Sequence, residues 1–362
     1  MKKVFKIKML VGGVLLSSSS LWAAEQDMDD MNFSFSSNDS EFSQTEEVNG
    51  NKESYKVEQH ETQKNDEKYS SGEMHGDKNG MPWLSVAWCS FGNDGLSGAN
   101  QDRVMMERSK KGLFFGVLGG YGENNNGTSI THVVSQKMPY YVQKDGLTEK
   151  ACENMNISLK ETMAEESQNN GCAAIMGFLG PKGKRLKIAN IGNARAMVFD
   201  ANGVFKYMSQ DHLASNKDEQ ERIRALNGIL IYNNGWRIGG NKDTLASRSF
   251  GYFKLATDGL IAQPDIIELA GKNSMKKGDC ILMGSHGFWD TVTESYKGNY
   301  DPYVLQDKEK NVIDILALNE LGRSIAEKRK SGLSIKEITK ELVDKAKDYT
   351  FDDVIVLMVE GM

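Results

Sequence analysis

The apolar segment FFGVLGGYG (residues 114–122) ends in a glycine-rich turn, the kind of strand end at which enzymes hold metals or phosphates. The predicted turn over residues 119–122 contains no carboxylate, histidine or cysteine. Side chains that could perform chemistry lie instead in three other short segments, which contain Asp102, His286 and Asp352. Strands that end in glycine turns and acidic motifs could bring these side chains together at one sheet edge. Hard ions such as Mg²⁺ would need several carboxylate oxygens there.

His286 beside Asp352 could hold a softer metal, because imidazole suits Zn²⁺ better than it suits Mg²⁺. A metal at a catalytic site usually has three protein ligands. We therefore favour a solvent-facing or hydrogen-bonded histidine at this position. Asp290 is expected to cap a helix that begins at Thr291 rather than to take part in chemistry. His212 is expected to be structural.

Short runs of β-branched and aromatic residues predict the strands that position these side chains. Tight turns at residues 180–183 and 200–203 indicate two hairpins. The predicted strands cover residues 83–91, 113–118, 172–179, 185–191, 194–199, 204–208, 280–283 and 354–359.

Helical stretches separate these groups of strands. Residues 147–168 alternate apolar and charged side chains at helical spacing, and residues 216–226 predict a shorter helix capped by Asn216. The sequence Ser334-Ile335-Lys336-Glu337 is a capping box that begins a helix to about Lys347. Grouped strands with long helices between them predict an α+β fold, a layered sandwich of two antiparallel β-sheets flanked by α-helices.

The order and content of the motifs resemble those of the metal-dependent type 2C serine/threonine protein phosphatases, the PPM-type family. The resemblance covers roughly residues 85–361. FFGVLGGYG resembles the family's strand that ends in D-G-H-G, and GDCILMGSHGFWD resembles the strand that ends in S-D-G-x-W-D. Six further segments follow the family's order: ANQDR (99–103), GCAAIMGFL (171–179), LKIANIGNARAMVF (186–199), SQDHLASNKDEQERI (209–223), LASRSFGYF (245–253) and TFDDVIVLMV (350–359).

The resemblance implies the PPM-type phosphatase fold and a two-metal site. Two Mg²⁺ or Mn²⁺ ions would hold a bridging water or hydroxide that attacks phosphorus in line. The resemblance places the corresponding positions of this chain at Gln101, Asp102, Gly119, Gly120, Tyr121, Asn193, His286 and Asp352.

Carboxylates are missing from most positions at which the family binds metal. Gly119 stands in place of the bridging aspartate, and Gln101 stands in place of a glutamate. His286 replaces the aspartate of S-D-G, and Asn193 replaces an aspartate used for an accessory metal. Such neutral replacements relieve the mutual repulsion of a carboxylate cluster that has lost its metal.

Few of the family's site residues remain. Gly120, which offers its backbone carbonyl to metal in the family, is kept, whereas Tyr121 replaces the family's histidine. The family's phosphate-binding arginine falls on Ser97, or on Gly98 if the loop slips by one residue. We therefore expect no catalytic residues, no cofactor and no bound metal. The residual metal candidates are Asp102, Gly120, His286 and Asp352.

Residues 1–24 have the lysines, short apolar run and small-residue cleavage site of a secretory signal peptide, which we favour over a membrane anchor. Residues 25–80 contain 15 acidic residues against 5 lysines and predict an acidic disordered leader. The phosphatase-like domain is then residues 81–362. Its net charge is near zero, so it has no basic footprint for nucleic acid.

The four cysteines show neither a CxxC pair nor a Cys/His ligand spacing, so we expect no cysteine zinc site, and their pairing is left open. They are Cys89, Cys152, Cys172 and Cys280.

The sequence predicts a pseudophosphatase that is exported to the periplasm or secreted and acts as a binding or scaffold module. The expected partner is a protein, for example a phosphoprotein or a kinase, with no nucleic acid and no stable membrane anchor. One alternative is an active serine/threonine phosphatase that uses Mg²⁺ or Mn²⁺ at a rearranged site. That site would contain His286, Asp352, Asp102 and Asp290. Another alternative is a module that holds phosphate or a small ligand in the vacated cleft.

Overall fold

The computed structural model describes residues 47–48, 51–52, 68–75, 84–93, 100–122, 127–233, 235–240, 244–294 and 309–361. The chain divides into two compact units, residues 1–55 and 56–362. In the first unit, the described residues form strands β1 (Glu47–Val48) and β2 (Asn51–Lys52), which pair antiparallel. The signal peptide predicted for residues 1–24 lies outside the described residues.

The second unit contains two large antiparallel sheets. The first sheet has the strand order β10-β9-β15-β16-β4-β3, with β3 at one edge. Residues that point to alternate faces of β4 enter different hydrophobic clusters, Val86 on one side and Ala87 on the other. The strands of this sheet are β3 (Tyr69–His75), β4 (Leu84–Phe91), β9 (Arg195–Phe199), β10 (Phe205–Met208), β15 (Cys280–Gly284) and β16 (Val354–Gly361).

The second sheet has the order β14-β8-β7-β6-β5, and the short strand β13 also pairs with β7. Tight turns join β7 to β8 and β9 to β10, as the two predicted hairpins require. The strands of this sheet are β5 (Arg103–Ser109), β6 (Gly112–Gly122), β7 (Asn170–Leu179), β8 (Arg185–Ile191), β13 (Phe250–Gly251) and β14 (Asp265–Ala270).

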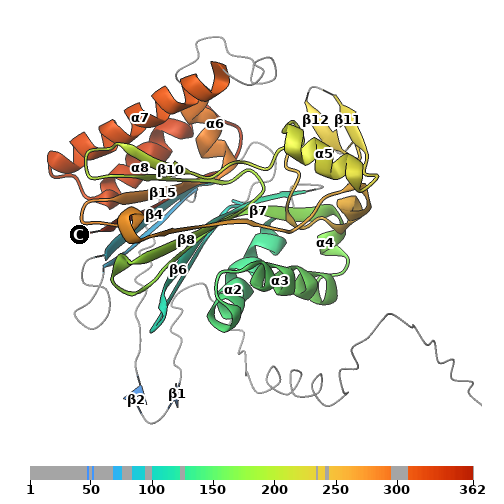
Figure 1. The fold of residues 1–362 in the computed structure, drawn as a ribbon, viewed down its shortest axis with the longest axis horizontal. Helices are drawn as coiled ribbons and strands as arrows, with labels where there is room; N and C mark the ends of the chain where they lie inside the picture. The colour runs from blue at the N-terminus through green and yellow to red at the C-terminus, as the bar shows by residue number, and fades with distance from the viewer. Residues whose placement is uncertain are drawn as a thin grey trace, which may run out of the picture. The chain divides into compact units, whose positions relative to one another are not determined.

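Hydrophobic clusters cover both faces of each sheet. The cluster between the sheets includes Phe115 and Ile175 from one sheet and Ile281 and Leu357 from the other. Helices α2 (Gly127–Asp145) and α3 (Glu149–Thr162) pack on the outer face of the second sheet. Helices α6 (His286–Glu294), α7 (Glu309–Lys330) and α8 (Ile335–Ala346) lie on the outer face of the first (Figure 1). The layered sandwich predicted from the sequence is therefore confirmed.

Two of the predicted helix starts differ in how they are capped. The capping box at Ser334 is present, because the Ser334 and Glu337 side chains each bond to the other's backbone. Asn216 precedes helix α5 (Lys217–Ala225) but makes no capping bond, and its side chain donates to the Asp211 carbonyl instead. The predicted helix over 147–168 is divided into α3 and the short helix α4 (Glu166–Asn169).

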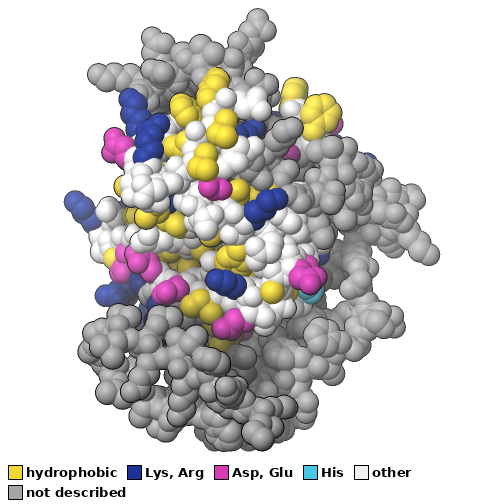
Figure 2. Space-filling model, turned by 90° about the vertical axis from the view of Figure 1, so that its right-hand side faces the viewer, with side chains coloured by type: hydrophobic (Ala, Val, Ile, Leu, Met, Phe, Trp, Pro, Cys, Tyr) yellow, Lys and Arg dark blue, Asp and Glu magenta, His cyan; other side chains and the backbone are white. Residues whose placement is uncertain are grey.

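Helix α5 lies beside a hairpin of β11 (Leu230–Tyr232) and β12 (Trp236–Ile238), with its own small hydrophobic cluster. Several apolar side chains of this region are exposed, and Figure 2 shows hydrophobic side chains gathered on the face that carries it. We call this group the apolar band; its members are Leu226, Ile229, Ile231 and Tyr232.

The predicted boundary at residue 81 is too late, because β3 falls inside the segment predicted as a disordered leader. Strand β3 pairs along its length with β4, from Tyr69 opposite Phe91 to His75 opposite Ser85. Its sequence is mostly polar because it is an edge strand, of which only Met74 packs against the cluster between the sheets. Among the helices that the structure describes, none has both the length and the apolar character needed to cross a membrane.

Candidate functional site

Gly119 lies near the end of β6, at a position where a Cβ atom would fit without a clash. Residues 119–122 were predicted as a turn, but they continue β6 and pair with β7, with Gly119 opposite Ala173. A Cβ atom on Gly119 would lie 3.6 Å from Asp102 Oδ1 and 3.8 Å from Ser285 Cβ, which is ordinary van der Waals contact. The backbone therefore admits a Cβ atom here without a clash, and the carboxylate is absent because the residue is glycine.

Asp102 is the carboxylate closest to this open position, and it is 8% exposed. Burial raises its pKa well above the usual range, and the charges of Asp353 and Asp352 add to the shift. Hydrogen bonds from Ser285 and from the Gly120 backbone oppose that shift in pKa. Its Oδ2 atom has no hydrogen-bond partner among the described residues. The surroundings therefore favour the neutral acid.

Gln101 is used to hold helix α2. The Gly127 amide, at the first residue of α2, donates to Gln101 Oε1 at 2.8 Å, and the Thr131 hydroxyl donates to the Gln101 carbonyl at 2.8 Å. The side chain thus satisfies a free amide at the helix N-terminus. Gly120 lies against the same segment, because a Cβ atom there would come within 2.7 Å of the Gln101 carbonyl. Tyr121 packs edge-on to Tyr252 at 5.9 Å between ring centres.

Asp353, which the sequence did not single out, fixes the loop before β5. Its two carboxylate oxygens accept hydrogen bonds from the backbone N–H groups of Asn93 at 2.8 Å and Gln101 at 2.7 Å. Its neighbour Asp352 is exposed and keeps its own backbone amide bonded to Thr350 Oγ1. The pair of adjacent aspartates therefore divides into one that holds the backbone and one that faces solvent.

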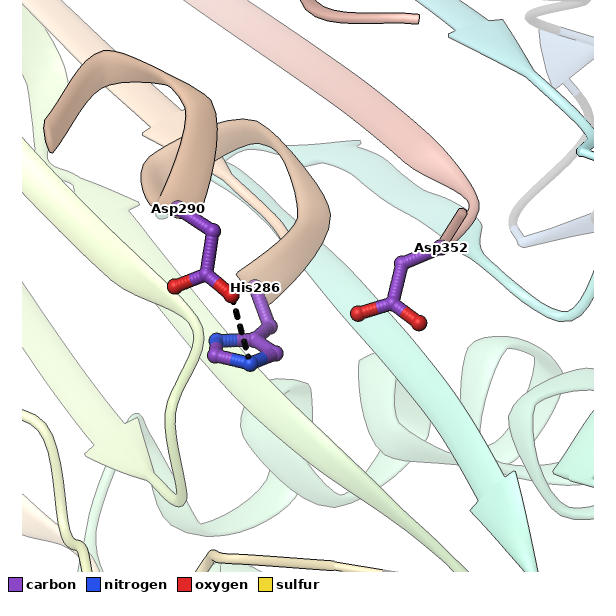
Figure 3. Close-up of side chains that lie close together, drawn as sticks. All are labelled: His286, Asp290 and Asp352. Atoms are coloured by element: carbon purple, nitrogen blue, oxygen red, sulfur yellow. Dashed lines mark ion pairs between the residues drawn. The ribbon is translucent and has the colours of Figure 1, made fainter. Parts of the chain in front are cut away.

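His286, Asp290 and Asp352 converge on one point of the surface (Figure 3). One ligand atom from each lies within 4.8 Å of the others, and His286 Nε2 lies 3.1 Å from Asp290 Oδ2. The prediction that Asp290 caps a helix from Thr291 was wrong. Helix α6 begins at His286, so Asp290 lies four residues along it and shares its face.

Packing fixes the start of α6 against the strand end that carries Asp352. A Cβ atom on Gly287 would lie 2.4 Å from the Asp353 carbonyl and 2.9 Å from Asp352 Cβ, so only glycine allows this approach. The Trp289 indole donates to the carbonyls of Arg195 at 3.0 Å and Gly284 at 3.1 Å. The buried Trp289 thereby anchors α6 to β9 and β15.

The carboxylate of Asp290 lies in a strongly charged neighbourhood. Desolvation raises its pKa, the His286 ring lowers it, and the Asp352 charge raises it. Arg195 is the nearby cation, and its guanidinium is held by Asp211 through two bonds of 2.9 Å. Asp290 itself keeps about half of its side chain exposed, with 52% accessible.

Asn193 and His212 belong to the structural frame beside the site. Asn193 is buried in the turn between β8 and β9. The Gly192 amide donates to His212 Nδ1 at 3.2 Å, and His212 Nε2 lies 3.1 Å from Asp265 Oδ2. Burial lowers the pKa of His212, and the Arg248 charge lowers it further. The structural role predicted for His212 is confirmed by these contacts.

Glu219 ties α5 to the segment before β13. Burial opposes its ionisation, but hydrogen bonds from Arg222, Arg248 and Ser247 lower its pKa to about 2. The side chain is 5% exposed and lies 2.8 Å from both guanidinium groups. This buried network stabilises the region that carries the apolar band.

All four cysteines lie within the described residues, and each is free and buried. Burial raises the pKa of Cys89, of Cys152 and of Cys280 to about 12, and it raises the pKa of Cys172 further. A thiol that stays protonated is a poor nucleophile and a poor metal ligand. The cysteines are therefore core residues, as the apolar runs around Cys89, Cys172 and Cys280 indicate in the sequence.

The described residues do not fit a two-metal carboxylate centre. Such a centre needs several oxygen ligands shared between two ions. Gly119 supplies no side chain, and the Gln101 side chain accepts a hydrogen bond at the start of α2. Asp102 is buried, and burial raises its pKa and favours the neutral acid. The carboxylates that remain exposed, on Asp290 and Asp352, gather around a histidine instead. Ser97 and Gly98 lie outside the described residues.

The sequence analysis named all three members of the cluster for a rearranged metal site, but it favoured a capping role for Asp290. The spacing of four residues between His286 and Asp290 was the available signal, because residues four apart share one face of a helix. That signal depends on where α6 begins, and the start was placed five residues too late. The role of Asp353 had no comparable signal, since adjacent aspartates look alike in sequence.

Comparisons with known proteins agree with the fold. A family model described as protein phosphatase 2C matches residues 107–296. Probable protein phosphatase 2C 32 of Oryza sativa subsp. japonica is 28% identical over 200 residues, which cover 52% of this chain and 48% of that protein. Probable protein phosphatase 2C 8 of the same plant is 35% identical over 126 residues, 35% of this chain and 29% of that protein. The chain thus spans about half or less of the length of these relatives.

Solved structures show the same fold at low sequence identity. A phosphatase from a pathogenic strain of Toxoplasma gondii superimposes with a TM-score of 0.60 at 15% identity, over 77% of this chain and 93% of that one. A C. elegans sex-determining protein gives a TM-score of 0.53 at 14% identity, over 76% and 64% of the two chains. With the family match over more than half of its length, the chain belongs to the protein phosphatase 2C family.

Proposed function

We propose that this chain uses a protein phosphatase 2C domain to bind a protein partner and does not hydrolyse phosphate esters. Gly119 carries the proposal, because its backbone and surroundings admit a side chain and none is present. Without a bridging carboxylate, two hard cations at this edge would lack the shared ligand that holds them a few Å apart. No attacking hydroxide would then be generated between them.

Other residues of the site support the same proposal by the tasks they perform. Gln101 caps α2, and Asp353 holds the loop before β5. Asp102 lies buried beside the open position, where a neutral acid is favoured. These contacts stabilise the edge of the sandwich in the absence of metal, which suits a domain retained for its surface rather than for turnover.

The apolar band supports a protein partner. Exposed apolar side chains that cluster on one face are typical of protein interaction sites. Leu226, Ile229, Ile231 and Tyr232 are exposed apolar side chains at the end of α5 and in or next to β11. We propose a phosphoprotein or a kinase as the partner class, and the N-terminal sequence leads us to propose that the protein is exported.

Hydrolysis of a phosphothreonine peptide tests the proposal. We expect turnover with Mg²⁺, Mn²⁺ or Zn²⁺ to equal that of Asp352→Asn, which removes a carboxylate exposed at the site. Metal-stimulated turnover above this control would contradict the proposal. Capture of the same peptide by wild-type protein without its hydrolysis is the expected behaviour of a binding module.

An active phosphatase with a rearranged metal site is the second candidate. The convergence of His286, Asp290 and Asp352 favours it, because a metal held there would have an open position for water. The same peptide assay distinguishes the two candidates. The second requires turnover that is lost in His286→Ala.

A further inference from the structure

We infer that His286, Asp290 and Asp352 form a site for one borderline divalent cation, for which Zn²⁺ is the best match. The site is distinct in chemistry from a two-metal carboxylate centre, because it combines one imidazole with two carboxylates and serves a single ion. Imidazole nitrogen is a better ligand for Zn²⁺ than for Mg²⁺, whereas carboxylates accept both. Three protein ligands with one position left open is a common zinc arrangement.

The spacing of the ligands suits a single ion. His286 and Asp290 lie four residues apart on α6, so both side chains leave the helix on the same side (Figure 3). Asp352 reaches the same point from the segment before β16, and the three ligand atoms lie within 4.8 Å of one another. Zinc–ligand distances of about 2.0–2.2 Å require atoms somewhat closer than this, which small rotations of exposed side chains achieve.

The backbone around the site is held in place without a metal. Gly287 allows α6 to touch the backbone at Asp352 and Asp353, and Trp289 bonds the helix to β9 and β15. The ligands are therefore brought together by the fold and do not depend on an ion to assemble them. A preformed site costs less conformational entropy when the ion binds.

The charge around the site favours a cation. The charges of Asp352 and Asp353 raise the pKa of the buried Asp102, so these acidic side chains lie near one another, and Asp102 Oδ2 has no hydrogen-bond partner among the described residues. Arg195 is the cation that faces Asp290, and Asp211 already binds its guanidinium through two bonds. The local excess of carboxylates is thus balanced only in part.

Isothermal titration of the full chain with Zn²⁺ and with Mg²⁺, after treatment with EDTA, tests the inference. We expect one Zn²⁺ per chain and much weaker binding of Mg²⁺. His286→Ala and Asp290→Asn should each weaken Zn²⁺ binding by at least about 100-fold, beyond the 10- to 100-fold cost usual for residues that only support a ligand. Substitution by Co²⁺ should give a visible absorption band that is lost in His286→Ala.

His75→Ala is the matched control, because His75 is also exposed and lies 3.5 Å from a carboxylate, that of Glu73. Its Zn²⁺ binding should equal that of wild type. Absence of Zn²⁺ binding by wild type, or binding that survives both His286→Ala and Asp290→Asn, would overturn the inference. Circular dichroism of each variant confirms that lost binding is not lost folding. Peptide hydrolysis is scored separately, so failure of the zinc site and failure of the proposed function give different results.

Discussion

At Gly119 the fold accepts a side chain, so alanine and aspartate separate the effect of volume from that of charge. Gly119→Ala should leave the free energy of unfolding unchanged or raise it by about 0.4–1 kcal/mol, since it lowers the entropy of the unfolded chain without a clash. Gly119→Asp in EDTA should be about 1–2 kcal/mol less stable than Gly119→Ala, the cost of about one unit of pKa shift among neighbouring carboxylates. Urea unfolding measures both. Equal stability of the two variants would show that the carboxylates are farther apart or better screened than the structure places them.

Asp102 gives stability a pH dependence with a definite sign. Its folded-state pKa is raised, so the folded state binds a proton that the unfolded state releases, and stability falls as pH rises above the unfolded value of about 4. An asparagine side chain at this position would mimic the neutral acid at every pH. The stability of Asp102→Asn relative to wild type should therefore increase between pH 5 and pH 8, as followed by urea unfolding at each pH. A constant difference would contradict a raised pKa.

At the scale of single residues, the sequence predicts which residue type stands at each position of the site. It does not predict which of these side chains come into contact. The replacement of carboxylates at Gly119, Gln101 and Asn193 is visible from motif order alone. The contact between His286 and Asp290 is not, because it depends on the first residue of α6. The start of α6 depends on tertiary packing. Here Gly287 contacts the backbone of Asp353, which lies 66 residues later in the chain.

At the scale of elements, the Glu219 network joins α5 to the loop before β13. Glu219→Gln should lower the free energy of unfolding by about 3 kcal/mol, because two half-buried guanidinium groups lose the buried anion they share, although Arg248 keeps its ion pair with Asp265. The matched control is Glu221→Gln on the exposed side of the same helix, which should change stability by less than about 0.5 kcal/mol. Chemical unfolding at pH 7 measures both variants.

The pH profile of Glu219→Gln gives an independent check. The folded-state pKa of Glu219 is about 2, below the ordinary value of 4.5, so its contribution is present above pH 4.5 and is lost as pH falls toward 2. The gap in stability between wild type and Glu219→Gln should narrow over that interval. A gap that widens on acidification would mean that the network does not hold the ionised carboxylate.

Elements with strong internal patterns were predicted well. The apolar runs of β7, β8, β15 and β16 are buried on both faces, which makes them visible in the sequence. Strand β3 and helix α2 were missed. Strand β3 is a polar edge strand, and the start of α2 is satisfied by Gln101, a residue 26 positions earlier in the chain. Neither feature has a local signature.

At the scale of the whole molecule, the sandwich of two sheets is the part of the prediction that sequence supports best. Each motif alone is a weak signal, but eight motifs in the family's order predict the fold, and the structure has the two antiparallel sheets of that fold. Retention of the fold with loss of its metal ligands is physically consistent. The central cluster between the sheets is built from apolar side chains of both sheets, so this part of the core makes no use of the site carboxylates.

The melting temperature of the full chain with and without Mg²⁺ or Mn²⁺ tests the absence of a two-metal centre most directly. A ligand that binds only the folded state at 100 times its Kd stabilises it by about 2.7 kcal/mol. Because Gly119, Gln101 and Asp102 supply no shared carboxylate, we predict the same melting temperature in EDTA and in millimolar Mg²⁺ or Mn²⁺. A clear rise with Mg²⁺ that disappears on addition of EDTA would contradict this account, because it would show that enough oxygen ligands converge at the site to bind a hard ion.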